Sequence, residues 1–450
     1  MYTISKDAPL NLETLNKYLT AHLSGKRRAK QQELHRAYLG DYPILYRTKP
    51  DYKPNNTLVN NYAKYIVDTF CGFFDGKPLT VSSQNETVNA VVKNFDTENM
   101  SDHKNYELIK QAAIFGNCYE LMYQDEDGHT RNAVLNPLDT FVVYDDTVEH
   151  RPVFGVTFRR DAETMTMTGE MYTSDTVYSF EGVYNGVSSM KEVGRNEYYT
   201  VPLIEYTFNN ERQGIFENVL SLINAYNQVL SEKANDVEYF SDAYMVILGA
   251  DLGIVPDKEP QEQLEELTKN IKQNRLLWLN SDDTTDGGQL PDVKFLGKPE
   301  ADTTQENLLK HLEENIFHLS MVANISDESF GTASGIALQY KLLNMRNLAK
   351  TVERSVTMSM RQRYKMLFSF ASNISPALAN EWTTLEFKFY ENLPVNALET
   401  AQALATFNGL VSDETALKMA GIDNPQEELE RMEKENKEPV FDFEKSEIDG

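Results

Sequence analysis

Apolar residues recur at steps of three and four near the start of the chain, the spacing that gathers side chains on one face of an α-helix. One such series predicts a helix with Asn56 as its N-cap and Gly72 or Gly76 at its end. Its apolar positions are Leu58, Tyr62, Ile66, Phe70 and Phe73. A further helix is predicted over residues 106–115, so the first 120 residues are expected to be mostly helical.

From Cys118 to Phe208 the period changes to two, in short runs separated by turn signals. Asp127-Gly128 and Asn185-Gly186 are two of these signals, of the kind that joins antiparallel strands. The predicted strands cover residues 119–123, 141–144, 153–159, 177–181 and 203–208. The N-terminal part is therefore predicted to be α+β, with helices first and an antiparallel sheet region after them.

Two long helices with a small module between them are predicted in the middle of the chain. The first, over residues 216–244, has a narrow apolar stripe and polar residues on its other faces, so it cannot be buried all round. The second, over 303–321, has its stripe at Leu308, Leu312, Ile316 and Leu319. Residues 245–299 predict a small α/β module that contains a charged helix at 260–274 and a β-type run at 276–279.

A polar break follows the second of these helices. Residues 326–335 hold two glycines and five Ser, Asp or Glu residues, which predicts a projecting or hinged loop. A long helix is predicted over 336–370, where the Met-rich tract 358–366 is interpreted as core packing. A strand over 384–390 comes next, and beyond Pro394 the chain is predicted to be helical and acidic, with Asp413 and Asn424 as caps.

Composition adds limits to this picture. The chain has 450 residues and is 41% hydrophobic, enough for two to four substructures with cores of their own. Its longest apolar run near the middle, 244–248, is far short of the roughly 20 residues of a membrane span. The start of the chain lacks the apolar stretch of a secretory signal, and the two cysteines, Cys71 and Cys118, fit a reducing compartment.

The formal net charge of −26 means that a static grip on nucleic acid would need a local basic patch. The run 26–30, Lys-Arg-Arg-Ala-Lys, is one candidate patch. A basic run of this kind is more often a solvated helix face, and we interpret it in that way.

A search for catalytic, cofactor or metal chemistry finds no constellation. Gly72 to Pro78 comes nearest to a phosphate-binding loop, but it is one residue short and has Pro where Ser or Thr is required. His311 and His318 are interpreted as surface residues, and both cysteines as small buried hydrophobes. The acidic pairs 145–146 and 282–283 are interpreted as turn residues. We therefore predict no enzyme activity, no cofactor and no metal site.

A series of short motifs, each weak alone, resembles the portal proteins of long-tailed, siphovirus-type double-stranded DNA bacteriophages. Their shared order over roughly residues 55 to 350 carries the resemblance. The motifs are Asn61-Tyr-Ala-Lys-Tyr-Ile-Val-Asp68, Phe74-Asp-Gly-Lys-Pro78, Asn136-Pro137, Val143-Tyr-Asp-Asp146, Val201-Pro-Leu-Ile-Glu205, Asn209-Asn210, Leu222-Ile-Asn-Ala-Tyr-Asn227, Ser326-Asp-Glu-Ser-Phe-Gly331 and Ser334-Gly-Ile-Ala-Leu338.

The resemblance implies an α+β, mainly helical portal fold, assembled as a ring of about twelve copies around a central channel. It also implies a division of the chain into named parts. These are a wing at 1–215, a stem helix at 216–244, a clip at 245–300, a second stem helix at 301–322, a tunnel loop at 323–335, a long helix with a wing strand at 336–396, and a crown with an acidic tail at 397–450.

The implied function is a channel at one capsid vertex for DNA packaging and ejection, in a virion assembled in the cytoplasm of a bacterial host. The implied partners are viral double-stranded DNA, the terminase large subunit, a head-tail connector or adaptor protein, and the major capsid and scaffolding proteins, with no membrane. The DNA-facing residues are expected to be Asn324, Ser326, Asp327, Glu328, Ser329 and Thr332. The expected terminase or connector contacts in the clip are Asp282, Asp283 and Asp286.

Two alternatives remain open at this point. One is a capsid-associated adaptor that binds the ring without forming the channel. The two long helices argue against it, because adaptors of that kind are usually much smaller proteins. The other is a cytoplasmic hydrolase whose acidic residues bind a divalent metal. A ring of about a dozen subunits seen by negative-stain microscopy would favour the portal hypothesis over both.

Overall fold

The computed structural model describes residues 1–51, 53–183, 186–240, 244–248, 276–279, 292–296, 302–325 and 335–392, and beyond these 402, 405–406, 411–419, 428–429 and 431–434. The chain divides into two compact units, Met1–Glu391 and Asn392–Gly450. In the second unit, helix α12 spans Asp413–Met419. Its predicted cap is one residue off, because the hydroxyl of Ser412 precedes the helix and accepts a hydrogen bond from the amide of Thr415 at 3.4 Å.

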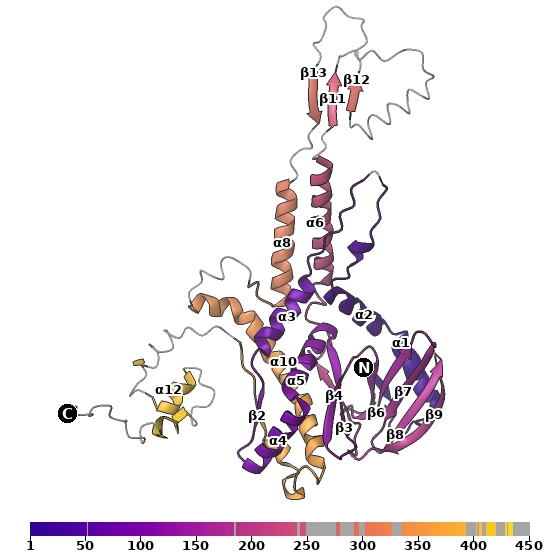
Figure 1. Cartoon of the computed structure of the whole chain (residues 1–450), viewed down its shortest axis with the longest axis vertical. Helices are drawn as coiled ribbons and strands as arrows, with labels where there is room; N and C mark the ends of the chain where they lie inside the picture. Colours follow the sequence, from indigo (N-terminus) through magenta and orange to yellow (C-terminus); the bar gives the residue numbers. More distant parts are fainter. Residues whose placement is uncertain are drawn as a thin grey trace, which may run out of the picture. The chain divides into compact units, whose positions relative to one another are not determined.

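In its described residues, the first unit combines helices with four sheets of two to six strands (Figure 1). Its α-helices are α1 (Leu12–Leu23), α2 (Lys26–Tyr38), α3 (Tyr62–Phe74), α4 (Glu86–Asn99), α5 (Ser101–Phe115), α6 (Leu220–Phe240), α8 (Asp302–Ser320) and α10 (Gly335–Ser369). Its strands are β1 (Tyr2–Ile4), β2 (Thr80–Ser82), β3 (Asn117–Gln124), β4 (Thr130–Leu135), β5 (Thr140–Asp145), β6 (Pro152–Asp161), β7 (Thr166–Tyr172), β8 (Thr176–Val183), β9 (Gly186–Arg195), β10 (Leu203–Thr207), β11 (Tyr244–Leu248), β12 (Leu276–Leu279), β13 (Asp292–Leu296) and β14 (Glu386–Lys388).

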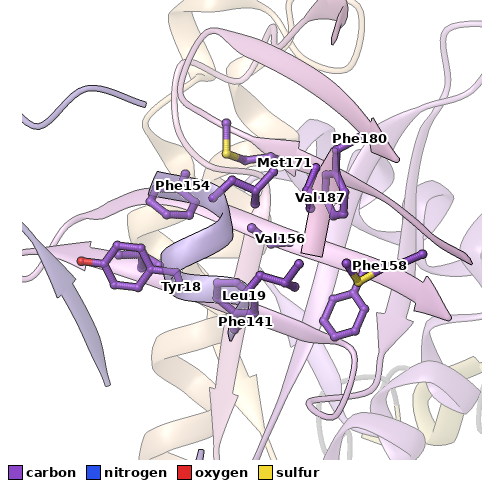
Figure 2. Close-up of a cluster of buried hydrophobic side chains, with 12 residues drawn as sticks. Tyr18, Leu19, Phe141, Phe154, Val156, Phe158, Met171, Phe180 and Val187 are labelled. Carbon is purple, nitrogen blue, oxygen red and sulfur yellow. The ribbon is translucent and has the colours of Figure 1, made fainter. Parts of the chain in front are cut away.

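The largest sheet has six strands in the order β1-β5-β6-β7-β8-β9. Its strands pair antiparallel, as the sequence predicts, except that β1 adds to β5 in parallel. One face of the sheet carries alternate apolar residues that pack under α1 (Figure 2). In this core, Leu19 of α1 lies among Phe141, Phe154 and Val156.

A second sheet, β10-β3-β4, packs against the other face of the first one. Tyr119 and Leu203 from this sheet meet Val142 and Tyr172 from the six-stranded sheet, and all four side chains are buried. The sequence predicted β3, β5, β6, β8 and β10 but not β4, β7 or β9. The predicted turn at Asp127-Gly128 is confirmed, since Gly128 joins β3 to β4 with φ +78°. The Asn185 part of the other turn lies outside the described residues.

Helices α3 and α5 pack together beside these sheets, and the sequence predicted both. The predicted cap of α3 is wrong, because Asn61 and not Asn56 caps the helix by accepting a hydrogen bond from the amide of Lys64 at 3.1 Å. α5 begins at Ser101, five residues before its predicted start. Helix α10 follows its prediction closely, but the strand predicted over 384–390 shrinks to β14, which pairs with β2.

The middle of the chain contains both predicted long helices, with different bounds. α6 ends at Phe240 and not at 244, because Tyr244 belongs to strand β11. β11 is the central strand of a small sheet, parallel to β12 and antiparallel to β13. β12 coincides with the predicted run at 276–279, whereas the predicted helix at 260–274 lies outside the described residues.

Candidate functional site

The two long helices α6 and α8 lie side by side and run antiparallel (Figure 1). Near one end, the amide of Gln305 donates a hydrogen bond to Asp236 at 2.9 Å, and Lys233 forms an ion pair with Glu306. At the other end, the side-chain amide of Asn218 donates to the carbonyl of Leu319 at 2.9 Å. Polar contacts near both ends therefore fix the register of the pair.

A ladder of buried polar side chains holds an extended segment, residues 56–60, against α6. The side-chain oxygens of Asn235, Ser231 and Asn227 accept hydrogen bonds from the backbone N–H groups of residues 56, 58 and 60, at 2.6, 2.9 and 2.8 Å. Four residues of helix rise about 6 Å, and two residues of extended chain advance about 6.6 Å. The two periods match closely enough for three successive rungs.

Ion pairs extend this attachment beyond the ladder. Arg47 and Lys49 both pair with Glu232 on α6, and the Lys49 ammonium lies 2.7 Å from the carboxylate. Burial opposes the charge on Glu232, but hydrogen bonds from Lys49 and Asn235 and the charge of Arg47 hold its pKa below the usual value. The segment that precedes α3 is thus tied to α6 through charge as well as through hydrogen bonds.

The start of the predicted tunnel loop is anchored to the helices. α8 ends at Ser320, the next residue Met321 turns the chain with a φ of +60°, and Val322 is buried just after it. The side-chain amide of Asn324 donates to Glu313 of α8 at 3.2 Å, and the amide of Ile325 donates to the hydroxyl of Tyr65 on α3 at 3.1 Å. The other predicted DNA-facing residues, Ser326, Asp327, Glu328, Ser329 and Thr332, lie outside the described residues, as do the clip residues Asp282, Asp283 and Asp286.

A buried ion pair at the centre of the unit was not predicted from the sequence. Arg363 of α10 contacts both carboxylate oxygens of Glu120 on β3, each at 2.9 Å, and both side chains are fully buried. The hydroxyl of Tyr206 donates to the same carboxylate at 2.8 Å, and Arg363 also donates to Asn105 at 2.8 Å. Burial opposes the charge on Arg363, but Glu120 outweighs it and raises the pKa of the guanidinium. The available signal was Glu120, the one charged residue of β3, whereas α10 holds several basic residues and nothing in its sequence singles out Arg363.

The interpretation of the basic run at 26–30 as a solvated helix face is wrong for two of its residues, Arg27 and Arg28. Arg28 is 6% exposed and donates from Nε to the carbonyl of Leu138 at 3.0 Å. Arg27 pairs with Glu217 at 3.2 Å and donates to the carbonyls of Phe115 and Arg212. These arginines join α2 to the β4–β5 connection, to the end of α5 and to the segment before α6, so their charges stabilise contacts within the fold.

The described part of the chain offers no arrangement that could perform catalysis through a thiol or a metal. No cluster of three or more His, Cys, Asp or Glu residues able to hold a metal ion occurs among the described residues. Burial raises the pKa of the Cys71 and Cys118 thiols, which makes both poor nucleophiles. His311 lies on the surface, 3.6 Å from Glu314. None of the described helices is both long and apolar enough to cross a membrane.

Comparison with known proteins gives direct evidence of a family relationship. Residues 17–440 match the family described as phage portal protein, SPP1 Gp6-like. The portal protein of Bacillus phage SPP1 is 24% identical over 407 residues, which cover 86% of this chain and 77% of the relative. The portal protein of Clostridium phage phiCD119 is 21% identical over 261 residues, 58% of this chain and 54% of the relative.

Two solved structures of gene transfer agent particles also resemble this chain. A chain from the neck of an empty particle has a TM-score of 0.44 and 13% identity, with 81% of this chain and 90% of that chain covered. A chain from the native virion has a TM-score of 0.41 and 12% identity, with 87% and 93% covered.

Proposed function

Because the chain belongs to the SPP1 Gp6-like family of phage portal proteins, we propose that it assembles as a ring of about twelve copies around a channel for double-stranded DNA. As a member of this family it is a structural protein of the virion, located at the portal vertex of the capsid, and not an enzyme.

The antiparallel pair α6 and α8 is the observation that supports the proposal most directly. Its two helices are held in register by polar contacts and end in two different features: the small sheet around β11, and the anchored start of the break. We assign the pair to the stem, the sheet to the clip, and residues 323–335 to the tunnel loop. The N-terminal sheets with α10 form the wing, and residues 397–450 form the crown.

In this arrangement Asp327, Glu328 and their polar neighbours of the tunnel loop face the passing DNA. The net charge of −26 supports a loose contact, because each phosphate neutralised by Lys or Arg would add affinity and resist sliding. The clip, with Asp282, Asp283 and Asp286, docks the terminase large subunit during packaging and the head-tail connector afterwards. The major capsid and scaffolding proteins contact the wing.

Electron microscopy of the purified protein tests the proposal. We expect negatively stained particles to be rings with a central hole, and a cryo-electron microscopy reconstruction to place residues 324–332 at the narrowest point of the channel. Mass determination by light scattering should give a ring of about twelve copies. A stable monomer or dimer would contradict the ring, and residues 324–332 on the outer rim would contradict the tunnel loop alone.

A further inference from the structure

A polar cavity of about 470 Å³ lies between β2 and the helices α4 and α5. Four consecutive residues, Leu79 to Ser82, line one wall. Successive side chains of a strand point to opposite faces, so four consecutive lining residues mean that the backbone itself borders the cavity. β2 pairs with β14 and with no second strand in the described part of the chain, which leaves one of its edges without a strand partner.

The opposite wall is acidic and contains an unused hydrogen-bonding group. Asp102 of α5 is exposed and forms no ion pair with a described residue, while Asp96 of α4 accepts a hydrogen bond from the hydroxyl of Tyr364 at 3.1 Å. Burial raises the pKa of the Asp96 carboxyl, although the hydroxyls of Ser101 and Tyr364 and the charge of Arg363 act in the opposite direction. Ser101 is 3% exposed, and its hydroxyl lies near Asp96 without the geometry of a hydrogen bond.

The charge of the cavity has a definite sign. Lys93 also lines it and is exposed, so two carboxylates face one ammonium group and leave an excess of one negative charge. The uncapped start of α5 adds a weak positive potential, because Met100 stands at its N-cap position and makes no side-chain cap. Asp102, in the first turn of α5, already offsets this potential. The cavity therefore favours a cationic group over an anionic one.

We propose that this cavity receives an extended segment of another protein, which adds to the free edge of β2 as a third strand and places an arginine or lysine side chain between Asp96 and Asp102. Strand addition supplies affinity through backbone hydrogen bonds, and the acidic wall supplies specificity through one side chain. The hydroxyl of Ser101 is the additional polar group that can bond to the incoming backbone. The cavity volume lies within the usual range for a small ligand.

This inference does not depend on the channel or on the number of copies in the ring. It rests on the walls of one cavity within the first unit, and those walls include no residue of the paired helices, the tunnel loop or the clip. A failed binding test would therefore leave the proposed conduit unaffected. In the same way, evidence against a ring would not count against binding at this cavity.

Fluorescence anisotropy with the purified full-length protein tests the site. The probe is a labelled, end-blocked peptide, Thr-Val-Arg-Val-Thr, and its matched control has Glu in place of Arg. We expect saturable binding of the Arg peptide and at least about tenfold weaker binding of the Glu peptide. Asp102→Asn, at an exposed position, should weaken the Arg peptide about threefold to tenfold. Lys93→Gln should strengthen it, and Glu126→Gln, in the distant β3–β4 turn, should leave it unchanged.

Hydrogen exchange provides the second readout, because bound peptide should slow exchange of those backbone amides at 79–82 that point away from β14. The proposal is overturned by equal binding of the two peptides, by absence of saturable binding, or by binding that ignores Asp102→Asn. Unchanged exchange at 79–82 in the peptide complex would overturn the strand addition. If the isolated chain binds the Arg peptide and the assembled protein excludes it, the occupant is a second copy of this chain, and the assignment to another protein is wrong.

Discussion

Arg363 and Glu120 form an ion pair through two contacts of 2.9 Å although 243 residues separate them, and neither side chain is exposed to solvent. The pair joins the long helix α10 to the central strand β3 of the second sheet. Because water is excluded, each charge depends on the other for compensation. The tertiary contact between helix and sheet is therefore sensitive to the loss of either residue.

Removing one partner of this pair should be strongly destabilising. We expect Glu120→Gln to lower the free energy of unfolding by about 3 kcal/mol, since it leaves the Arg363 guanidinium buried without its counter-ion. The measurement is thermal or urea unfolding of the purified chain. The matched control is Glu126→Gln, at an exposed turn position, which should change stability by less than about 0.5 kcal/mol.

A double variant separates the charge effect from packing. Arg363→Met combined with Glu120→Gln removes both charges, so it should cost less than the sum of the two single changes. Additive costs would mean that the pair contributes no coupling energy, and the interpretation of a mutually compensating pair would then be wrong.

The ladder between α6 and residues 56–60 predicts a local change that leaves the global fold in place. Asn235→Leu removes the acceptor for the Asn56 amide, a bond of 2.6 Å, and leaves that donor unsatisfied. We expect hydrogen exchange of the amides at 56 and 58 to accelerate about fivefold to thirtyfold, the equivalent of about 1–2 kcal/mol. Gln228→Ala, on the exposed face of the same helix, is the control. Equal exchange in both variants would show that the ladder does not hold the segment.

Asp75 predicts a pH dependence of stability. It is 8% exposed, one of its carboxylate oxygens has no hydrogen-bond partner, and burial together with the nearby Asp102 raises its pKa to about 7. Between its unfolded value near 4 and about 7, the folded chain binds more protons than the unfolded chain. The contribution of Asp75 to stability is therefore present at low pH and is lost as the pH rises through this window.

Asp75→Asn should remove that dependence. At pH 8 we expect the variant to be more stable than the native chain by on the order of 2 kcal/mol, whereas at pH 4 the two should be nearly equal. Melting temperatures measured from pH 4 to 8 check this. A variant that is less stable than the native chain at pH 8 would contradict this prediction, because it would show that the ionised carboxylate of Asp75 is compensated in the folded chain.

Gly116 and Gly128 offer a matched pair of backbone tests. Both have positive φ, +85° and +78°, but a Cβ at Gly116 would lie 2.1 Å from the carbonyl oxygen of Arg212, whereas a Cβ at Gly128 would meet open space. We expect Gly128→Ala to cost about 1 kcal/mol from backbone strain alone. Gly116→Ala should cost clearly more, because the backbone at Arg212 and the side chain of Arg27 must also move. Similar melting temperatures for the two variants would contradict the close approach.

The sequence predicts the buried face of a helix well where its apolar residues form one clear stripe. It predicts that face poorly where neighbouring apolar residues allow two stripes. In α8, the neighbouring apolar pairs Leu308-Leu309 and Ile316-Phe317 leave the phase of the stripe ambiguous. Leu308 and Leu319 were predicted to be in the stripe but are 46% and 49% exposed, while Leu309 and Phe317 are buried instead. The choice depends on where α6 and the aromatic ring of Tyr62 lie, which local periodicity does not contain.

The burial of polar residues could not be predicted from the sequence for a related reason. Asn227, Ser231 and Asn235 were assigned to the outer faces of α6, yet they are among its most buried side chains. Their partners are backbone groups 167 to 179 residues away, so no local signal distinguishes them from solvated residues. The family resemblance, by contrast, depends on ordered motifs and was confirmed by the match over residues 17–440.

The proposed tunnel loop gives the sharpest functional prediction. If Asp327 and Glu328 face the DNA, the double change to Lys should replace weak repulsion by attraction in every copy of the ring, and about two charges reversed in each of about twelve copies is a large effect. We expect packaging to slow, with the greatest loss at low salt, because the attraction to phosphates falls steeply as salt rises. The measurement is the rate at which DNA becomes protected from nuclease in a packaging reaction at several salt concentrations.

The matched control for this experiment is Glu126→Lys together with Asp127→Lys, a reversal of two neighbouring charges in the exposed β3–β4 turn of the proposed wing. It changes the net charge by the same amount, so it corrects for general effects on solubility and assembly. Loss of packaging in the loop variant alone, relieved by added salt, would assign the acidic pair to the DNA path. Equal rates for the two variants would remove Asp327 and Glu328 from the channel wall while leaving the ring itself intact.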